Sequence, residues 1–126
     1  MRLPLIAAGL LSAVVLVPAT AGAGTQDVAH SAARAPQKKT VKIGDNFYAP
    51  TKLTVNRNST ITWKWPSEIG DSHDVALDRG PKGFKTFESD IAGSSFSYKK
   101  KLTKPGTYKI YCTLHEEMTM TIKVRS

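Results

Sequence analysis

The chain has 126 residues, a formal net charge of +8 and a single cysteine. This length allows one domain and little more, and a lone cysteine excludes a fold held by an intramolecular disulfide. The basic balance favours attraction to anionic surfaces or partners, but the lysines do not alternate with aromatic residues in a base-stacking pattern, which argues against a nucleic-acid-binding protein.

The N-terminus has the pattern of a secretory signal peptide. Arg2 is followed by an apolar run over residues 3–17 and then by small residues up to Ala23. The run is shorter than the ~20 apolar residues that usually span a bilayer, and a basic start with a small-residue exit is typical of a cleaved signal. We therefore expect residues 1–23 to be a signal peptide and the protein to be secreted, in the periplasm or outside the cell envelope. Loss of Arg2 leaves a net charge of +7.

Residues 24–38 are small and polar, so we expect a flexible linker. From residue 39 to residue 126, apolar residues alternate with polar ones in short runs that are separated by turn residues. The alternating sets are, in chain order, Val41 with Ile43, Leu53 with Val55, Ile61 with Trp63 and Trp65, Phe96 with Tyr98 and Leu102, Tyr108 with Ile110 and Cys112, and Met120 with Ile122 and Val124. These sets predict an all-β domain, a Greek-key β-sandwich of about seven or eight strands.

Two connections carry further signals. Residues 66–90 contain several prolines and glycines and predict a loop, in which a short helix is left open. Residues 102–108 place the turn Pro105-Gly106 just before a strand that carries Tyr108. That order is typical of a tyrosine corner, in which the tyrosine hydroxyl bonds upstream backbone.

The candidate functional residues gather near the C-terminus, where Cys112 is followed by His115 at +3 and Met118 at +6. Alternation points the Cys112 sulfur into the sandwich, and we expect the other two in the loop where that strand ends. His73 is the only other histidine in the predicted domain. A thiolate, two imidazoles and a thioether form the ligand set of a blue-copper site, whereas zinc sites do not use a thioether. The sequence therefore predicts one copper ion held by these four residues.

Two alternatives stand beside this interpretation. Cys112 alone is more often a small core residue than a ligand, and Met120 competes with Met118 for the axial position. Met120 is in phase with Ile122 and Val124, which favours a packing role and leaves Met118 as the ligand.

Residues 42–125 resemble the cupredoxins, especially the small bacterial amicyanin and plastocyanin-like group. The matching residues are Phe47, Pro50, Leu53-Thr-Val55, Ile61-Thr-Trp63, His73-Asp-Val75, Phe96-Ser-Tyr98, Pro105-Gly106-Thr-Tyr108 and Cys112-Thr-Leu-His115-Glu-Glu-Met118. The resemblance implies one type 1 copper ion that alternates between Cu(I) and Cu(II), and a role as a one-electron carrier between transient redox partners.

The resemblance also implies roles for neighbours of the ligands. His115 would be the electron port beside Leu114, with Glu116 and Glu117 flanking it. Asp74 stands where these proteins commonly carry Asn, whose side chain locks the two ligand loops together near the residue after the cysteine, here Thr113. Asp74 would add a negative charge near copper and lower the reduction potential.

Other functions use the same residues differently. A copper scavenging or delivery protein without a relay role is the alternative function. Catalysis by several copper ions needs further histidines or a second cysteine, so we expect no enzyme.

We also expect a monomer. Residues 99–101 with Lys104 fit a solvated strand and turn, and as a docking site they would suit an anionic lipid or envelope polymer.

Overall fold

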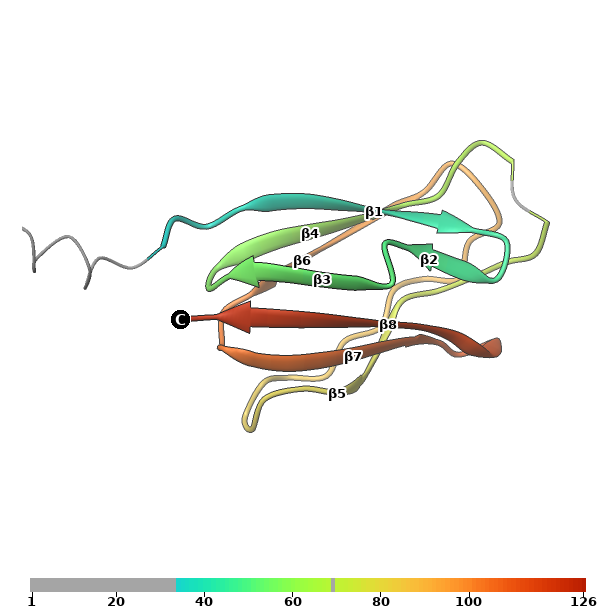
Figure 1. Cartoon of the computed structure of the whole chain (residues 1–126). Helices are drawn as coiled ribbons and strands as arrows, with labels where there is room; N and C mark the ends of the chain where they lie inside the picture. The colour runs from blue at the N-terminus through green and yellow to red at the C-terminus, as the bar shows by residue number, and fades with distance from the viewer. Residues whose placement is uncertain (1–33, 69) are drawn as a thin grey trace, which may run out of the picture. The chain divides into compact units, whose positions relative to one another are not determined.

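The computed structural model describes residues 34–68 and 70–126 (Figure 1). The expected signal peptide and residues 24–33 of the expected linker lie outside the described residues. No helix in the described part of the chain is long and apolar enough to cross a membrane.

The described residues form eight strands in two four-stranded sheets. The first sheet has the order β2-β1-β4-β6 and contains β1 (Lys38–Gly44), β2 (Phe47–Ala49), β4 (Ser59–Lys64) and β6 (Ser97–Leu102). The second has the order β3-β8-β7-β5 and contains β3 (Lys52–Asn56), β8 (His115–Arg125), β7 (Gly106–Cys112) and β5 (Ala76–Arg79). The pairs β1–β4 and β3–β8 are parallel and the other pairs are antiparallel. This architecture confirms the predicted all-β sandwich.

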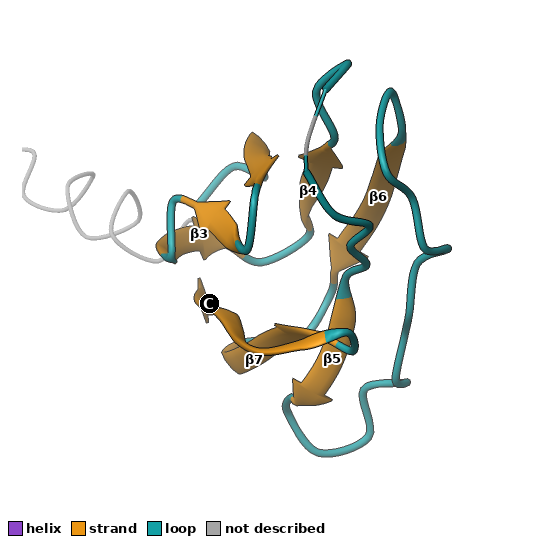
Figure 2. Ribbon diagram, turned by 90° about the vertical axis from the view of Figure 1, so that its right-hand side faces the viewer, coloured by secondary structure: helices purple, strands orange, loops and turns teal. Residues whose placement is uncertain are grey.

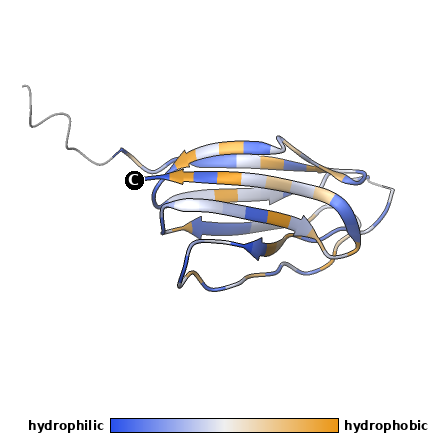
Figure 3. Ribbon diagram, turned by 60° about the horizontal axis from the view of Figure 1, so that its bottom comes forward, coloured by the Kyte–Doolittle hydropathy of each residue, from blue (hydrophilic) through white to orange (hydrophobic). Residues whose placement is uncertain are grey.

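The core lies between the sheets and is built from the alternating apolar residues, which appear as separate bands along the strands (Figure 3). Trp63 is fully buried, and its ring centroid lies 6.4 Å from that of Phe87 and 5.9 Å from that of Tyr98. Its Nε1–H donates to Met120 Sδ at 3.3 Å. Met120 therefore belongs to the packed core in phase with Ile122, as predicted.

Two strands were not predicted because they are short. β2 and β5 span three and four residues, too few for an alternating pattern to be recognised. Pairing with β1 and β7 defines them, and β5 also has an irregular register between Leu77 and Arg79. The helix left open within residues 66–90 is not present in the described part of that segment.

The chain is tied to the sandwich from Ala35 onward, before residue 39, where the domain was expected to begin. Asn56 Nδ2 donates to the Ala35 carbonyl at 2.8 Å, and the Gln37 N–H donates to Ser59 Oγ at 2.8 Å. The Gln37 side-chain oxygen accepts the Asn56 N–H at 3.1 Å. Polar contacts of this kind leave no periodic signal in a sequence.

The predicted tyrosine corner is confirmed. Tyr108 is buried, and its hydroxyl donates to the Lys104 carbonyl at 2.7 Å. This bond fixes the turn before β7 and so holds the strand that carries Cys112.

Tyr108→Phe should lower the free energy of unfolding of the apoprotein by about 1 kcal/mol, the usual net value of such a hydrogen bond. Urea denaturation measures the change. Tyr98→Phe is the matched control, because the structure records no hydrogen bond from the Tyr98 hydroxyl to any described residue. Equal losses of unfolding free energy in the two variants would show that the hydrogen bond from Tyr108 to Lys104 does not add to stability.

Three connections converge at one end of the sandwich. The β1–β2 turn, the loop after β4 and the β7–β8 turn all lie at the right-hand end of Figure 1, which faces the viewer in Figure 2. Residues far apart in sequence can therefore meet at this end.

Candidate metal centre

Three of the four predicted ligands meet at this end of the sandwich. Cys112 Sγ lies 3.6 Å from His115 Nδ1 and 4.0 Å from His73 Nδ1, and the two Nδ1 atoms are 3.2 Å apart. The three ligand atoms all lie within 4.8 Å of one another. The fold thus brings together residues separated by up to 42 positions in the chain.

The tight β7–β8 hairpin presents Cys112 and His115 side by side. Cys112 ends β7, His115 begins β8, and the two residues are partners across the hairpin after a register shift at Cys112. His115 and Met118 were expected in a loop, but both lie on β8. The hairpin turn is so short that the ligand spacing continues directly into the returning strand.

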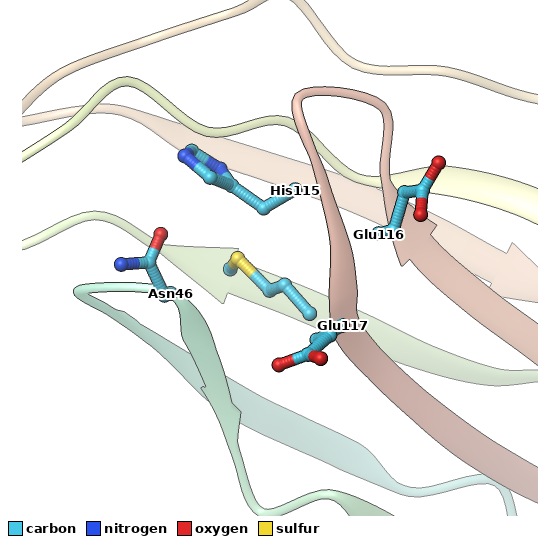
Figure 4. Close-up of a pocket in the computed structure, with 5 residues that line it drawn as sticks. Asn46, His115, Glu116 and Glu117 are labelled. Atoms are coloured by element: carbon cyan, nitrogen blue, oxygen red, sulfur yellow. The ribbon is translucent and has the colours of Figure 1, made fainter.

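Met118 is buried within the same region. It has 1% of its surface exposed and points inward in phase with Met120. Together with His115 it lines a pocket of about 440 Å³, whose other lining residues are Asn46, Glu116 and Glu117. In Figure 4 the His115 ring and the Asn46 side chain lie on one side of β8, and Glu116 projects from the other. The placement of Met118 agrees with a fourth ligand from within the core.

His73 is fully buried, and hydrogen bonds of its backbone groups fix its position. Its N–H donates to the Ala92 carbonyl and its carbonyl accepts the Ala92 N–H, both at 3.0 Å. These paired bonds fix the loop after β4 against the segment that precedes β6. The imidazole therefore extends into the ligand cluster from a backbone whose position is fixed.

Two aspartates face the outer nitrogens of the two imidazoles. Asp45 Oδ1 lies 3.7 Å from His73 Nε2, and Asp71 Oδ2 lies 3.7 Å from His115 Nε2. A histidine that binds metal through Nδ1 carries its proton on Nε2, where a nearby carboxylate orients the ring. Sequence reasoning missed both aspartates because they belong to no motif and come from different loops.

Asp74 links the two loops that carry the ligands. Its Oδ1 accepts the Thr113 N–H at 2.7 Å, and its Oδ2 accepts the Thr113 hydroxyl. The Asp74 carbonyl accepts a bond from the buried Tyr48 hydroxyl at 2.6 Å. Asp74 therefore makes the loop-to-loop contact expected at this position, and Tyr48 adds a support that the sequence did not reveal.

Burial sets the protonation of the cluster. Burial raises the pKa of the Cys112 thiol, backbone N–H groups of Asp74 and Leu114 partly oppose this, and the Asp74 charge adds to the rise. Burial also lowers the pKa of His73, and the neighbouring His115 lowers it further, against the opposing effect of Asp45. The apoprotein thus favours a neutral thiol and a neutral His73, and metal binding must displace the thiol proton.

The low pKa of His73 predicts a pH-dependent stability of the apoprotein. The unfolded state keeps a histidine pKa near 6.5 and binds more protons than the folded state as the pH falls. The free energy of unfolding should therefore decrease as the pH drops through about 6.5, and it should be restored above that value. Urea denaturation at several pH values measures the slope. His73→Asn should flatten it, and an unchanged slope in that variant would exclude His73 as the source.

The donor set itself tests which metal fits. A thiol sulfur, two imidazole nitrogens and a thioether sulfur are all soft or intermediate ligands. The thiol and imidazole atoms lie within 4.8 Å of one another, and His73, Cys112 and Met118 are each at most 1% exposed. Hard cations such as Mg²⁺ and Ca²⁺ require oxygen ligands, whereas copper suits this combination. The residues present therefore fit a copper ion.

Comparisons with known proteins give a consistent result. A family model described as copper binding proteins of the plastocyanin/azurin family matches residues 35–125. Plastocyanin from Dryopteris crassirhizoma is 28% identical over 95 residues, which cover 64% of this chain and 91% of that protein. A solved structure of the reduced Cu(I) form of an amicyanin mutant at pH 4 has a TM-score of 0.60 and 25% identity, covering 77% of this chain and 89% of that one. The copper-containing nitrite reductase from Thermus scotoductus shares the fold with a TM-score of 0.60 and 23% identity over 74% of this chain, which spans only 23% of the reductase.

Proposed function

The chain belongs to the plastocyanin/azurin family of copper-binding proteins, and we propose that it is a secreted one-electron carrier and not an enzyme. The observation that carries the proposal is the convergence of one buried thiol and two imidazole nitrogens within 4.8 Å. Export after removal of residues 1–23 is part of the proposal, and N-terminal sequencing of the exported protein tests it.

The proposed ligands are His73, Cys112, His115 and Met118. The bound copper ion supplies one-electron chemistry between Cu(I) and Cu(II). The protein's contribution is to hold the ligands in the same positions for both charges of the copper ion. Paired backbone bonds fix His73, and the Asp74–Thr113 contacts fix the hairpin. Little then has to rearrange during electron transfer.

The two imidazoles differ in their access to solvent, which supports His115 as the electron port. The His73 side chain is 0% exposed, whereas that of His115 is 28% exposed. Leu114, next to it, is one of three large apolar residues that are strongly exposed in the described structure, together with Phe47 and Ile91. An exposed apolar residue beside the accessible ligand suits brief contact with a redox partner.

The immediate surroundings of this port are acidic although the protein as a whole is basic. Glu116 and Glu117 are exposed, and Asp71 stands beside the outer nitrogen of His115. Charges at the rim of a contact set the encounter rate more than the affinity. A partner with basic residues around its own redox centre would therefore be favoured.

Small oxidants of opposite charge test this local field. The reduced protein should lose its electron to cationic tris(phenanthroline)cobalt(III) about two- to fivefold more slowly in Glu116→Gln/Glu117→Gln at low ionic strength, and to anionic hexacyanoferrate(III) faster. Salt should remove both differences. Asp78→Asn/Glu88→Gln is the control with the same change in net charge. Stopped-flow rates that shift equally in both variants would show that only net charge matters.

The main experiment adds Cu(II) to the purified full chain. We expect an intense blue absorption, reversible bleaching by a reductant, and rapid electron self-exchange by NMR line broadening. We also expect slow transfer of copper to a competing chelator. A colourless product would overturn the copper-thiolate site. A blue protein with slow self-exchange that yields its copper readily would instead favour the scavenging or delivery role.

A further inference from the structure

The outward face of the first sheet is strongly basic. Strand alternation points nine residues of β1, β4 and β6 away from the core, and the structure leaves every lysine among them exposed. We call these nine residues the basic face: Lys38, Thr40, Lys42, Thr60, Thr62, Lys64, Ser97, Lys99 and Lys101. Five of the nine are lysines and none is acidic.

The strand register arranges the basic face as a regular array of three rows. One row runs Lys38, Thr60, Lys101, the next Thr40, Thr62, Lys99, and the last Lys42, Lys64, Ser97. In the last row two lysines are direct neighbours, an arrangement that costs stability when like charges meet on adjacent strands. The middle strand, β4, contributes Thr60, Thr62 and Lys64. Each of these three residues has a lysine, a threonine or a serine as its neighbour on both sides.

The lysines of the basic face have no acidic partner. Among the described residues the structure records three ion pairs, and none involves a lysine. Lys100, which lies between Lys99 and Lys101 in sequence, points inward instead, with its Nζ 5.2 Å from the centroid of the Phe87 ring. The five ammonium groups therefore all face solvent with their charge uncompensated.

The outer face of the second sheet differs in this respect. Its cations are partly engaged: Lys109 Nζ donates to Thr121 Oγ1 at 3.2 Å, and Arg125 donates to Asn56 Oδ1 at 3.0 Å. Arg79 pairs with Asp78 at 3.5 Å. Glu117 also projects from this side of β8. The outer face of the second sheet thus combines basic residues with an acidic one, whereas lysines are the only charged residues of the basic face.

We propose that the basic face lies against the surface of an anionic phospholipid bilayer. A three-by-three array is extended in two directions and matches a planar surface better than a linear polyanion, which would follow a groove or a single row. None of the nine residues is aromatic, and the exposed ring beside them, that of Phe47 on β2, lies over Gly44 at the edge of the sheet. A series of stacked nucleobases therefore finds no matching row of rings on this face. Lysine ammonium groups and threonine hydroxyls are donors to phosphate oxygens, and clusters of four to eight basic residues are typical of attraction to anionic lipid.

This orientation leaves the metal centre accessible. The β7–β8 turn and the loop after β4, which carry or adjoin the proposed ligands, lie at one end of the sandwich and not on the flat side formed by β1, β4 and β6 (Figure 1). The acidic residues Asp71, Glu116 and Glu117 belong to that end and not to the basic face. While bound to the membrane, the protein would present the end that carries the metal centre to partners along the membrane surface. The inference does not depend on the identity of the metal.

The test compares binding of the full chain to vesicles of phosphatidylglycerol and phosphatidylcholine with binding to pure phosphatidylcholine. The neutral vesicles measure any contribution from the apolar run over residues 3–17. The test variant is Lys42→Gln/Lys64→Gln/Lys99→Gln. The control variant, Lys52→Gln/Lys109→Gln/Lys123→Gln, makes the same change in net charge on the opposite sheet. Unfolding in urea confirms that all three proteins are folded.

We expect the test variant to bind anionic vesicles on the order of 100-fold more weakly, at about fivefold per lysine. The control variant should bind these vesicles less than about tenfold more weakly than the wild-type protein. Salt should strongly weaken the binding of the wild-type protein to anionic vesicles. Equal losses in the two variants would overturn the proposal, since net charge alone would then explain binding. Strong binding to heparin with no preference for anionic over neutral vesicles would also overturn it, in favour of a linear polyanion.

Discussion

Cys112→Ser should give a folded protein that no longer turns blue with Cu(II). Cys112 is the only cysteine and lies 1% exposed at the centre of the proposed ligand cluster. The intense absorption requires a thiolate bound to copper, so the loss should be essentially complete. Serine is of similar size, and burying its hydroxyl should lower the free energy of unfolding by only about 1–3 kcal/mol. Absorption during a Cu(II) titration, with urea denaturation of the apoprotein, measures both effects.

Leucine variants of the two methionines provide the matched comparison. Met118→Leu should change the spectrum and raise the potential, because it removes the proposed axial sulfur. Met120→Leu should keep the blue colour, since Met120 packs in the core and accepts the Trp63 N–H. A blue Cys112→Ser protein would exclude the thiolate as ligand. A Met120→Leu protein with an altered spectrum would indicate that the axial assignment is wrong.

The sequence predicted the sandwich because a half-buried strand has a simple period of two. Val41, Ile61, Trp63 and Ile110 are all fully buried, and each belongs to one of the alternating sets that predicted the strands. The same alternation directed Cys112 inward. The proposed ligand set could be named from the sequence because sulfur and imidazole groups are few in residues 39–126, where His73 is the only histidine besides His115.

Other features of the site depend on contacts that have no sequence period. Asp45 reaches His73 because the β1–β2 turn meets the loop after β4, and Asp71 reaches His115 because that loop also meets the β7–β8 hairpin. Tyr48 supports Asp74 through a backbone carbonyl, a contact open to any residue at position 74. The placement of His115 on a strand follows from the register shift at Cys112. Such details are set by tertiary packing rather than by local pattern.

Asp74→Asn should raise the midpoint potential of the copper-loaded protein. The substitution removes one buried negative charge, and an asparagine can still accept the Thr113 N–H and donate to the Thr113 hydroxyl. A unit charge within about 10 Å, at an effective dielectric constant of about 20, contributes about 1.7 kcal/mol. This corresponds to roughly 70 mV for a one-electron couple. Voltammetry or a redox titration followed by the blue absorption measures the shift.

Two further variants separate the charge of Asp74 from its role in joining the loops. Thr113→Val removes the hydroxyl bond but keeps the carboxylate, so it should loosen the hairpin with a much smaller change in potential. Asp74→Ala removes both the charge and the contact, so it should raise the potential and also speed the loss of copper to a chelator. If Thr113→Val shifted the potential as far as Asp74→Asn, the loop contact and not the charge would control the site. An unchanged potential in Asp74→Asn would contradict the prediction and show that the charge of this carboxylate does not set the potential of the site.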